Sequence, residues 1–361
     1  MSTVIHPCEG CELNAYALEI AGGHIEVMAR RTRPAGLLNL AAEDLISAVG
    51  GKRRDHLMRL LTAFDPEASR LRRADWGAVG GCRHQGGIPR QLGAFSDPEP
   101  PWVLNAKGNL DLLPDPDQGG YAGVVGARRA DAYGRHTAEH LAREVARAGG
   151  VVVSGLAFGV DAAAHRGALD AAGGRTIAVV GGGLDRPYPQ QNTGLHSQIA
   201  REALIIGEMP LGSGVWRWSF PARNRLIAAL STVVVVVQAA ARSGSLHTAD
   251  AALARGKPVA AVPGRIDLEV SEGSNGLLAD GAMMISSAAS LLDLLGLAPS
   301  RQEGVIPEEL ESAWQALRED RAVAVLDAGG PAATAIRSDL ARLELLGLAS
   351  RLPGGEWVSR A

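Results

Sequence analysis

The chain has 361 residues, of which 46% are hydrophobic, and this length allows two or three domains with a full apolar core in at least one of them. Its formal net charge of −3 excludes indiscriminate nucleic-acid binding by the whole surface, so contact with DNA or RNA requires a local basic patch. Arginine outnumbers lysine 33 to 3, which favours bidentate phosphate contacts but is explained better by a GC-rich genome.

The chain carries no signal for a membrane or an oxidising compartment. No apolar run approaches the roughly 20 residues that span a bilayer, and no leader-like segment precedes the first helical pattern. We therefore expect a cytoplasmic protein. Its three cysteines are an odd number, and a disulfide framework is not expected in that compartment.

Residues 1–87 predict a small N-terminal helical domain, because helix-like stretches alternate there with Gly and Pro. These stretches lie near 13–21, 37–48 and 55–63. Segment 88–120 is rich in Pro, Asp and Gly, and this composition predicts a turn-filled linker with one strand at Trp102–Leu104.

The cysteines of the N-terminal region support a separate hypothesis of a structural zinc site. Cys8 and Cys11 form a C-x-x-C pair, while Cys82 and His84 supply a third thiol and an imidazole. The C-x-x-C spacing suits zinc but C-x-H is short for a ligand pair, so unligated cysteines are the favoured alternative. A zinc ion would stabilise a helical domain that has few other means of holding its ends together. No other cofactor is expected.

Residues 121–296 predict a doubly wound, mostly parallel α/β domain. Apolar runs without alternation are typical of strands buried on both faces, and the helical patterns between them require parallel crossovers. The predicted strands are 121–125, 151–153, 176–180, 204–206, 233–237 and 259–262, and the predicted helices are 135–148, 161–171, 191–200 and 246–254. One helical face is shared by Ala138, Leu141, Ala142, Val145 and Ala148, as a helix packed on such a sheet requires.

The last segment, 304–361, has the order helix, helix, strand, glycine turn and strand, which predicts a winged-helix domain. It carries six arginines against nine acidic residues, whereas 121–296 carries sixteen basic against fourteen acidic residues. An acidic winged helix is a poor phosphate binder, so we expect it to contact protein rather than duplex DNA. Arg337 and Arg342 on the second helix are the evidence against this expectation.

The loops that follow the predicted strands indicate an anion-binding site, because ligands of open parallel sheets lie beyond the carboxyl ends of the strands. Five of these loops are rich in Gly or Ser: 126–129, 154–157, 181–185, 207–210 and 239–246. Tight turns explain any single loop, but not five in succession. Arginines in two places, Arg128-Arg129 and the run 220–225, favour polymeric phosphate as the ligand.

Several motifs in order resemble the DNA-processing protein A family, the DprA/Smf proteins. They are SGLAFGVDAAAHRGAL at 154–169, GGGLDRPYPQQN at 181–192, FPARNRLIAALS at 220–231, RSGSLHTA at 242–249, VPGRID at 262–267 and SEGSNGLLADGA at 271–282. The resemblance covers about 88–296. Two departures are Gln238, where the family usually has Glu, and Ala127, where Ser is more usual.

The resemblance implies a Rossmann-like core that binds and protects single-stranded DNA, acts as a homodimer and loads the RecA recombinase in natural transformation and homologous recombination. The residues expected to contact DNA are Gly126, Ala127, Arg128, Arg129, Ser154, Gly155, Phe220, Arg223, Asn224, Arg225, Ser243 and Gly244. The arginines would pair with successive phosphates, and Phe220 or Trp218 would stack a base at ~1–3 kcal/mol. The alternatives are core packing for Trp216, Trp218 and Phe220, and an ion pair for Arg225.

An enzymatic function is the alternative from a different class. Phosphoribohydrolases share a related glycine-rich core and use the glutamate of a P-G-G-x-G-T-x-x-E motif. The corresponding stretch, 243–250, has no such glutamate, and the chain has no Ser-His-Asp set or P-loop lysine, so we expect no catalytic activity. His165, in an apolar helical face, favours a packed structural role. A winged-helix transcription regulator is a third interpretation, weakened by the acidic wing.

Overall fold

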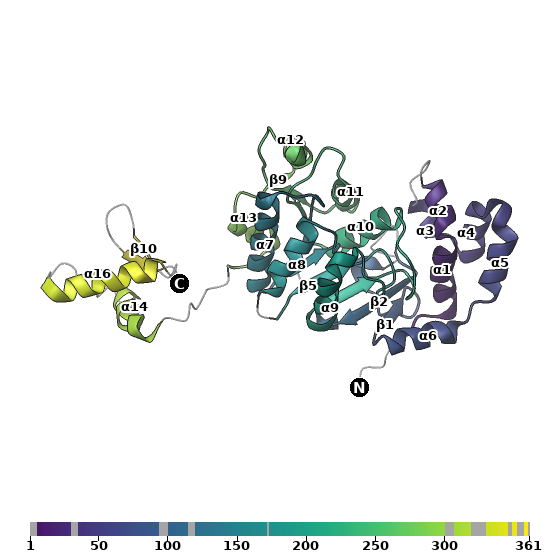
Figure 1. Ribbon diagram of the computed structural model, residues 1–361, viewed down its shortest axis with the longest axis horizontal. Coiled ribbons are helices and arrows are strands. Elements are labelled where there is room, and N and C mark those ends of the chain that lie inside the picture. The colour runs from purple at the N-terminus through teal and green to yellow at the C-terminus, as the bar shows by residue number, and fades with distance from the viewer. Residues whose placement is uncertain are drawn as a thin grey trace. The chain divides into compact units, whose positions relative to one another are not determined.

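The structure is a computed structural model that describes residues 6–29, 35–93, 100–114, 120–171, 173–299, 307–318, 330–345, 349–351 and 357–359 (Figure 1). The chain divides into two compact units, Met1–Pro299 and Ser300–Ala361. Among the described residues, no helix combines the length and the apolar character needed to cross a membrane.

The described residues of the N-terminal part of the first unit form six helices, which gather at one end of it (Figure 1). They are α1 (Glu9–Ile20), α2 (Gly22–Met28), α3 (Ala35–Leu38), α4 (Ala42–Val49), α5 (Arg54–Thr62) and α6 (Pro66–Asp75). Helix α6 begins with Asp65, whose carboxylate accepts the N–H groups of Glu67 and Ala68, and Pro66 follows in the first turn. The helices predicted near 13–21, 37–48 and 55–63 are confirmed.

The apolar faces of these helices enclose a core of their own, which includes Leu18, Ile25, Leu45 and Ile46. Trp218 joins this core from a distant part of the chain: it is 2% exposed, and its indole Nε1 donates to the carbonyl of Gly22 at 2.9 Å. The packing alternative for Trp218 is therefore confirmed.

A nine-stranded sheet forms the centre of the first unit, in the order β1-β2-β6-β5-β4-β3-β7-β8-β9. The strands are β1 (Val79–Cys82), β2 (Val103–Gly108), β3 (Tyr121–Val125), β4 (Val151–Ser154), β5 (Thr176–Val179), β6 (Leu204–Gly207), β7 (Val233–Val236), β8 (Val259–Ala261) and β9 (Met283–Met284). All pairs from β6 to β9 are parallel, whereas β2 is antiparallel to both β1 and β6. The mostly parallel sheet is confirmed, and two strands from 1–120 extend it.

Helices cover both faces of the sheet, as a doubly wound fold requires. On one face lie α7 (Ala132–Arg147), α8 (Val160–Leu169) and α13 (Ala288–Leu295), which pack on side chains such as Val124 and Val235. On the other face lie α9 (Thr193–Glu202), α10 (Ser219–Leu230) and α11 (Leu246–Leu253), which pack on Val125 and Val234 among others. Alternate residues of one strand thus face opposite layers, and the expected buried face of α7 is confirmed.

The remaining elements of the first unit are short. They are α12 (Glu272–Ala279) and the 3₁₀ turns Gly51–Arg53, Arg90–Leu92, Leu110–Leu112, Gln190–Asn192 and Glu269–Ser271.

The second unit contains a 3₁₀ turn (Glu308–Leu310), α14 (Glu311–Arg318), α16 (Gly330–Leu345) and an antiparallel pair of strands, β10 (Ala349–Arg351) and β11 (Trp357–Ser359). Leu310, Trp314 and Leu340 are among its core residues. These described elements follow the order expected from the sequence. The glycine turn at 353–355 lies outside the described residues, and the winged-helix assignment stays a prediction.

His165 on α8 is fully buried, in agreement with a packed role. Its Nδ1 lies 2.7 Å from the Thr176 hydroxyl, which itself donates to the Val152 carbonyl at 2.9 Å. Burial, together with the positive charges of Arg223 and Arg166, lowers the pKa of His165 to about 3. The imidazole is therefore neutral in the folded protein at neutral pH.

This burial predicts an acid-sensitive fold. Between about pH 6.5 and 3 the unfolded chain binds a proton at His165 that the folded chain does not, so the free energy of unfolding falls as pH falls, by up to about 1.4 kcal/mol per pH unit. Urea unfolding at pH 7, 6 and 5 measures this slope. His165→Gln should be less stable at pH 7 but have a shallower slope. An equal slope in both proteins would contradict the prediction.

Candidate nucleic-acid interface

A groove of about 800 Å³ opens at the carboxyl ends of the central parallel strands. Its walls come from the loop after β3, the first turn of α8, the start of α10 and the loops around Ser243 and Glu269. Of the described charged residues that line it, three are arginines, Arg128, Arg129 and Arg223, and two are acids, Asp161 and Glu269. The groove therefore has the basic excess that an anionic ligand requires.

The loop after β3 is held against the end of β7. The Ala127 N–H donates to the carbonyl of Gln238 at 2.6 Å, and the Ala127 side chain is buried. A Cβ on Gly126 would lie 2.6 Å from a methyl carbon of Val160, so only glycine fits this approach. The chain then turns outward, and the side chains of Arg128 and Arg129 are exposed to solvent.

Gln238, a departure from the usual family residue, has a structural partner in this turn. Its Oε1 accepts the N–H of Asp131 at 3.1 Å, and Asp131 in turn caps α7 by accepting the N–H of Gly134 at 2.8 Å. The amide thus fastens the start of α7 to the end of β7. An amide oxygen accepts this bond as a carboxylate would, so the substitution preserves the loop.

Aromatic rings lie beside the arginines. The guanidinium carbon of Arg128 lies 4.7 Å from the centre of the Phe220 ring, and the rings of Phe220 and Tyr188 have centres 5.5 Å apart. Tyr188 is 48% exposed and Phe158, which lines an adjoining small cavity, is 37% exposed. These rings can stack nucleic-acid bases beside a phosphate-binding cation. Sequence reasoning missed Phe158 and Tyr188, although both lie in the quoted motifs.

Arg223 lies beneath the groove with only 4% of its surface exposed. It fits because residue 155 is glycine: a Cβ there would be 1.4 Å from the Arg223 Nη1 atom. Burial, with a smaller contribution from the nearby charge of Arg128, lowers the pKa of Arg223 to about 10 against the opposing effect of Asp161. The guanidinium is therefore still charged at neutral pH.

The Arg223 guanidinium has unused donors. Within the described residues its Nε and Nη1 atoms are buried and have no hydrogen-bond partner. A buried cation with unsatisfied N–H groups is costly, and an anion in the groove would satisfy them. This makes Arg223 the residue in the groove whose environment points most directly to an anionic ligand.

The loop after β4 holds a strained backbone beside this arginine. Leu156 has φ 56°, in the left-handed backbone region that residues other than glycine rarely adopt. Its carbonyl accepts the Nδ2 amide of the buried Asn192 at 3.0 Å, which holds the loop in place. A residue held in this region costs about 1–3 kcal/mol, and such strained residues cluster at functional sites.

Asn224, Ser243 and Gly244, three of the residues expected to contact DNA, meet on one wall of the groove. The Asn224 side-chain amide donates to the Gly244 carbonyl at 3.2 Å, and the hydroxyls of Ser243 and Ser245 lie 2.8 Å apart. The second turn of α10 is thereby fastened to the loop that leads into α11.

Ser154 and Arg225 lie outside the groove. The Ser154 hydroxyl is fully buried and donates to the Val124 carbonyl at 2.6 Å. Arg225 is 3% exposed and forms a 2.6 Å ion pair with Glu208. Positions 223 and 225 point about 200° apart on a helix, so only one of them can face the groove. We therefore assign Ser154 and Arg225 structural roles in place of the predicted DNA contacts.

The fold and the groove together define a doubly wound α/β protein with a candidate anion-binding groove at the carboxyl ends of its parallel strands. The family model of DNA recombination-mediator protein A matches residues 82–296, and the chain belongs to this family.

Two curated relatives illustrate the match. The DNA processing protein DprA of Bacillus subtilis is 41% identical over 197 residues, which are 55% of this chain and 65% of the relative. The protein Smf of Escherichia coli is 33% identical over 284 residues, which are 74% of each chain. The chain spans 54–65% of the length of the relatives from Bacillus subtilis, Synechocystis and Mycobacterium tuberculosis.

Solved structures give the same result. DprA from Streptococcus pneumoniae is similar with a TM-score of 0.60 and 32% identity, over 78% of this chain and 97% of that one. DprA from Helicobacter pylori, whose structure describes a single-stranded DNA binding mode, has a TM-score of 0.54 and 34% identity, over 60% and 95% of the two chains. The resemblance inferred from the motifs is confirmed.

Proposed function

We propose that this chain binds single-stranded DNA in the groove and acts in homologous recombination and natural transformation by delivering the strand to the RecA recombinase. The observation that carries the DNA-binding part is the buried Arg223 guanidinium, whose Nε and Nη1 atoms have no partner among the described residues. Family membership and the DNA-binding mode described for the Helicobacter pylori relative support the same ligand.

The groove offers separate places for phosphate and base. Phosphates would pair with Arg128, Arg129 and Arg223, the first two reaching in from solvent and the third from below. Bases would stack on Tyr188 and Phe220, whose rings contact each other with centres 5.5 Å apart. Stacking needs an unpaired base, because duplex bases cover their faces with one another. This arrangement therefore favours single strands.

A comparison of single-stranded and duplex DNA tests the proposal. We expect fluorescence anisotropy with equal-length oligonucleotides to show at least about tenfold tighter binding of the single strand, a difference of ~1.4 kcal/mol, with little dependence on its sequence. Equal affinity for blunt duplex DNA would favour the transcription-regulator alternative. Hydrolysis of a nucleoside monophosphate by the purified protein would favour the phosphoribohydrolase alternative.

The homodimer and the RecA partner are proposals that rest on the family. Light scattering of the purified full chain would measure the first, with an apparent mass of about 75 kDa for two chains of 37.5 kDa. Loading of RecA onto single strands coated with single-strand-binding protein would measure the second. A monomer at all concentrations, or no acceleration of RecA loading, would remove the corresponding proposal.

A further inference from the structure

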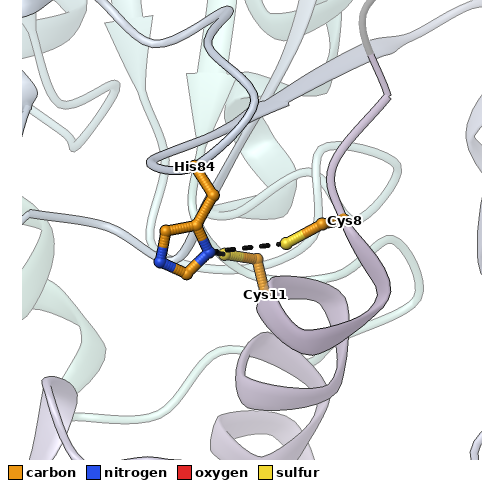
Figure 2. Close-up of side chains that lie close together, drawn as sticks. All are labelled: Cys8, Cys11 and His84. Atoms are coloured by element: carbon orange, nitrogen blue, oxygen red, sulfur yellow. Dashed lines mark hydrogen bonds between the residues drawn. The ribbon is translucent and has the colours of Figure 1, made fainter.

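Three side chains of metal-ligating types lie close together beside the edge strand β1, and none of them lines the groove (Figure 2). Cys8 is the N-cap residue of α1, and Cys11 lies in the first turn of the same helix. His84 comes from the turn that follows β1, more than seventy residues later in the chain. One ligand atom of each residue lies within 4.8 Å of the other two.

The distances match a tetrahedral metal site. The Nδ1 atom of His84 lies 3.5 Å from the Cys8 sulfur and 3.4 Å from the Cys11 sulfur. Zinc binds sulfur at about 2.3 Å and imidazole nitrogen at about 2.0–2.1 Å, so two ligands of a regular tetrahedron are about 3.6 Å apart. The three side chains thus have the spacing of bound ligands.

Cys82 supplies a third thiol next to this group and is the candidate for a fourth ligand. It is fully buried, and it shares a small apolar cluster with Cys8 and Cys11. Its sulfur accepts two backbone N–H groups, from Cys8 at 3.4 Å and from Gln85 at 3.3 Å. Backbone N–H donors around sulfur stabilise a thiolate, the form in which cysteine binds metal.

The turn after β1 explains why the short C-x-H spacing is no obstacle. The backbones of Cys82 and Gly86 exchange hydrogen bonds at 2.9 and 3.0 Å, which closes a tight hairpin around His84. Arg83 fixes the same hairpin from its other side, since its guanidinium lies 3.7 Å from the centre of the Trp102 ring. In this hairpin the His84 imidazole therefore reaches the sulfurs of Cys8 and Cys11, and the Cys82 sulfur approaches the same group of ligands.

We propose that Cys8, Cys11 and His84 hold a structural zinc ion and that Cys82 completes the site as its fourth ligand. A set of three thiolates and one imidazole suits zinc among the common metals. The ion would join helix α1 to the edge strand of the sheet, and metal binding would contribute directly to the stability of the N-terminal helices. Unligated cysteines, the alternative favoured by the sequence, leave the convergence of Cys8, Cys11 and His84 unexplained.

Elemental analysis of the full chain, purified from zinc-supplemented cells, tests this site. We expect about one zinc per chain in the wild type and in the matched control His136→Asn, which changes an exposed histidine of α7. We expect Cys11→Ser to bind less than about a tenth of that amount. Full retention of zinc by Cys82→Ser would overturn the four-ligand assignment, and full retention by Cys11→Ser would overturn the site.

A second measurement avoids variants that fail to fold. Zinc is removed from the reduced wild-type protein by a chelator, and Co²⁺ alone is then added. We expect the visible absorption bands of a tetrahedral cobalt–thiolate site at one equivalent, and a Tm that falls on chelation and recovers with zinc. Metal-free wild-type protein with an unchanged Tm and no cobalt bands, or a Cys8–Cys11 disulfide found in its place, would overturn the proposal.

Discussion

Replacing both Arg128 and Arg223 by alanine is expected to weaken single-stranded DNA binding at least a hundredfold. In the proposed complex each arginine would make a charge-assisted contact worth about 1.5–3 kcal/mol, so together they would contribute about 3 kcal/mol or more. Because each also neutralises a phosphate, the slope of log K against log salt should flatten by about 1.4 in the double variant. Fluorescence anisotropy at several salt concentrations measures both quantities.

The matched control for charge is Arg201→Ala, which removes a 68% exposed arginine paired with Glu202 and should leave the affinity unchanged within about twofold. Gly155→Ala is an independent route to the same result. Its Cβ would lie 1.4 Å from the Arg223 Nη1 atom and would displace the guanidinium without removing its charge. If the double variant keeps wild-type affinity and native circular dichroism, these arginines are not the DNA site.

Glu208→Ala is expected to lower the free energy of unfolding by about 3–5 kcal/mol, because it leaves the buried Arg225 without the carboxylate that it contacts at 2.6 Å. Urea unfolding measures this loss. If Arg225 is structural, the protein that stays folded at low temperature should bind single-stranded DNA within about twofold of the wild type. This experiment therefore distinguishes a structural role for Arg225 from the proposed DNA-binding role of Arg223, although the two lie on the same helix.

A double variant makes this test sharper. Replacing Glu208 by Leu and Arg225 by Met removes both charges and keeps apolar volume, so it should recover most of the stability that Glu208→Ala loses. Glu208→Ala without a loss of stability would show that the pair is not structural. A tenfold loss of DNA affinity in the folded double variant would return Arg225 to the binding site.

The sequence by itself determined the central architecture and the place of the candidate groove. An unbroken apolar run such as 233–236 is stable only between two layers, and the helical segments between such runs require parallel strands, so the sheet and both helix layers followed. The glycine-rich loops then had to meet at one edge, because the carboxyl ends of parallel strands lie together. Arg128, Arg223 and Asn224 were predicted in this way, and they line the groove.

The sheet's outer strands depended on tertiary structure. Strand β1 has the sequence VGGC, which does not alternate apolar and polar side chains, and it joins the sheet through backbone hydrogen bonds to β2, which overlaps the strand predicted at Trp102–Leu104. A backbone pairing of this kind has no signature in composition, so residues 79–82 were assigned to a helical region. The same strand carries Cys82 and leads to His84, so the meeting of these residues with Cys8 also required the fold.

The choice between Arg223 and Arg225 was decided only by packing. Helix α10 is buried nearly all round, so its sequence has no polar face to show which arginine points to the groove. Glu208 at the end of β6 and the missing Cβ of Gly155 made that choice, since one binds Arg225 and the other makes room for Arg223. Both partners are distant in sequence, and contacts between distant residues arise only when the chain folds.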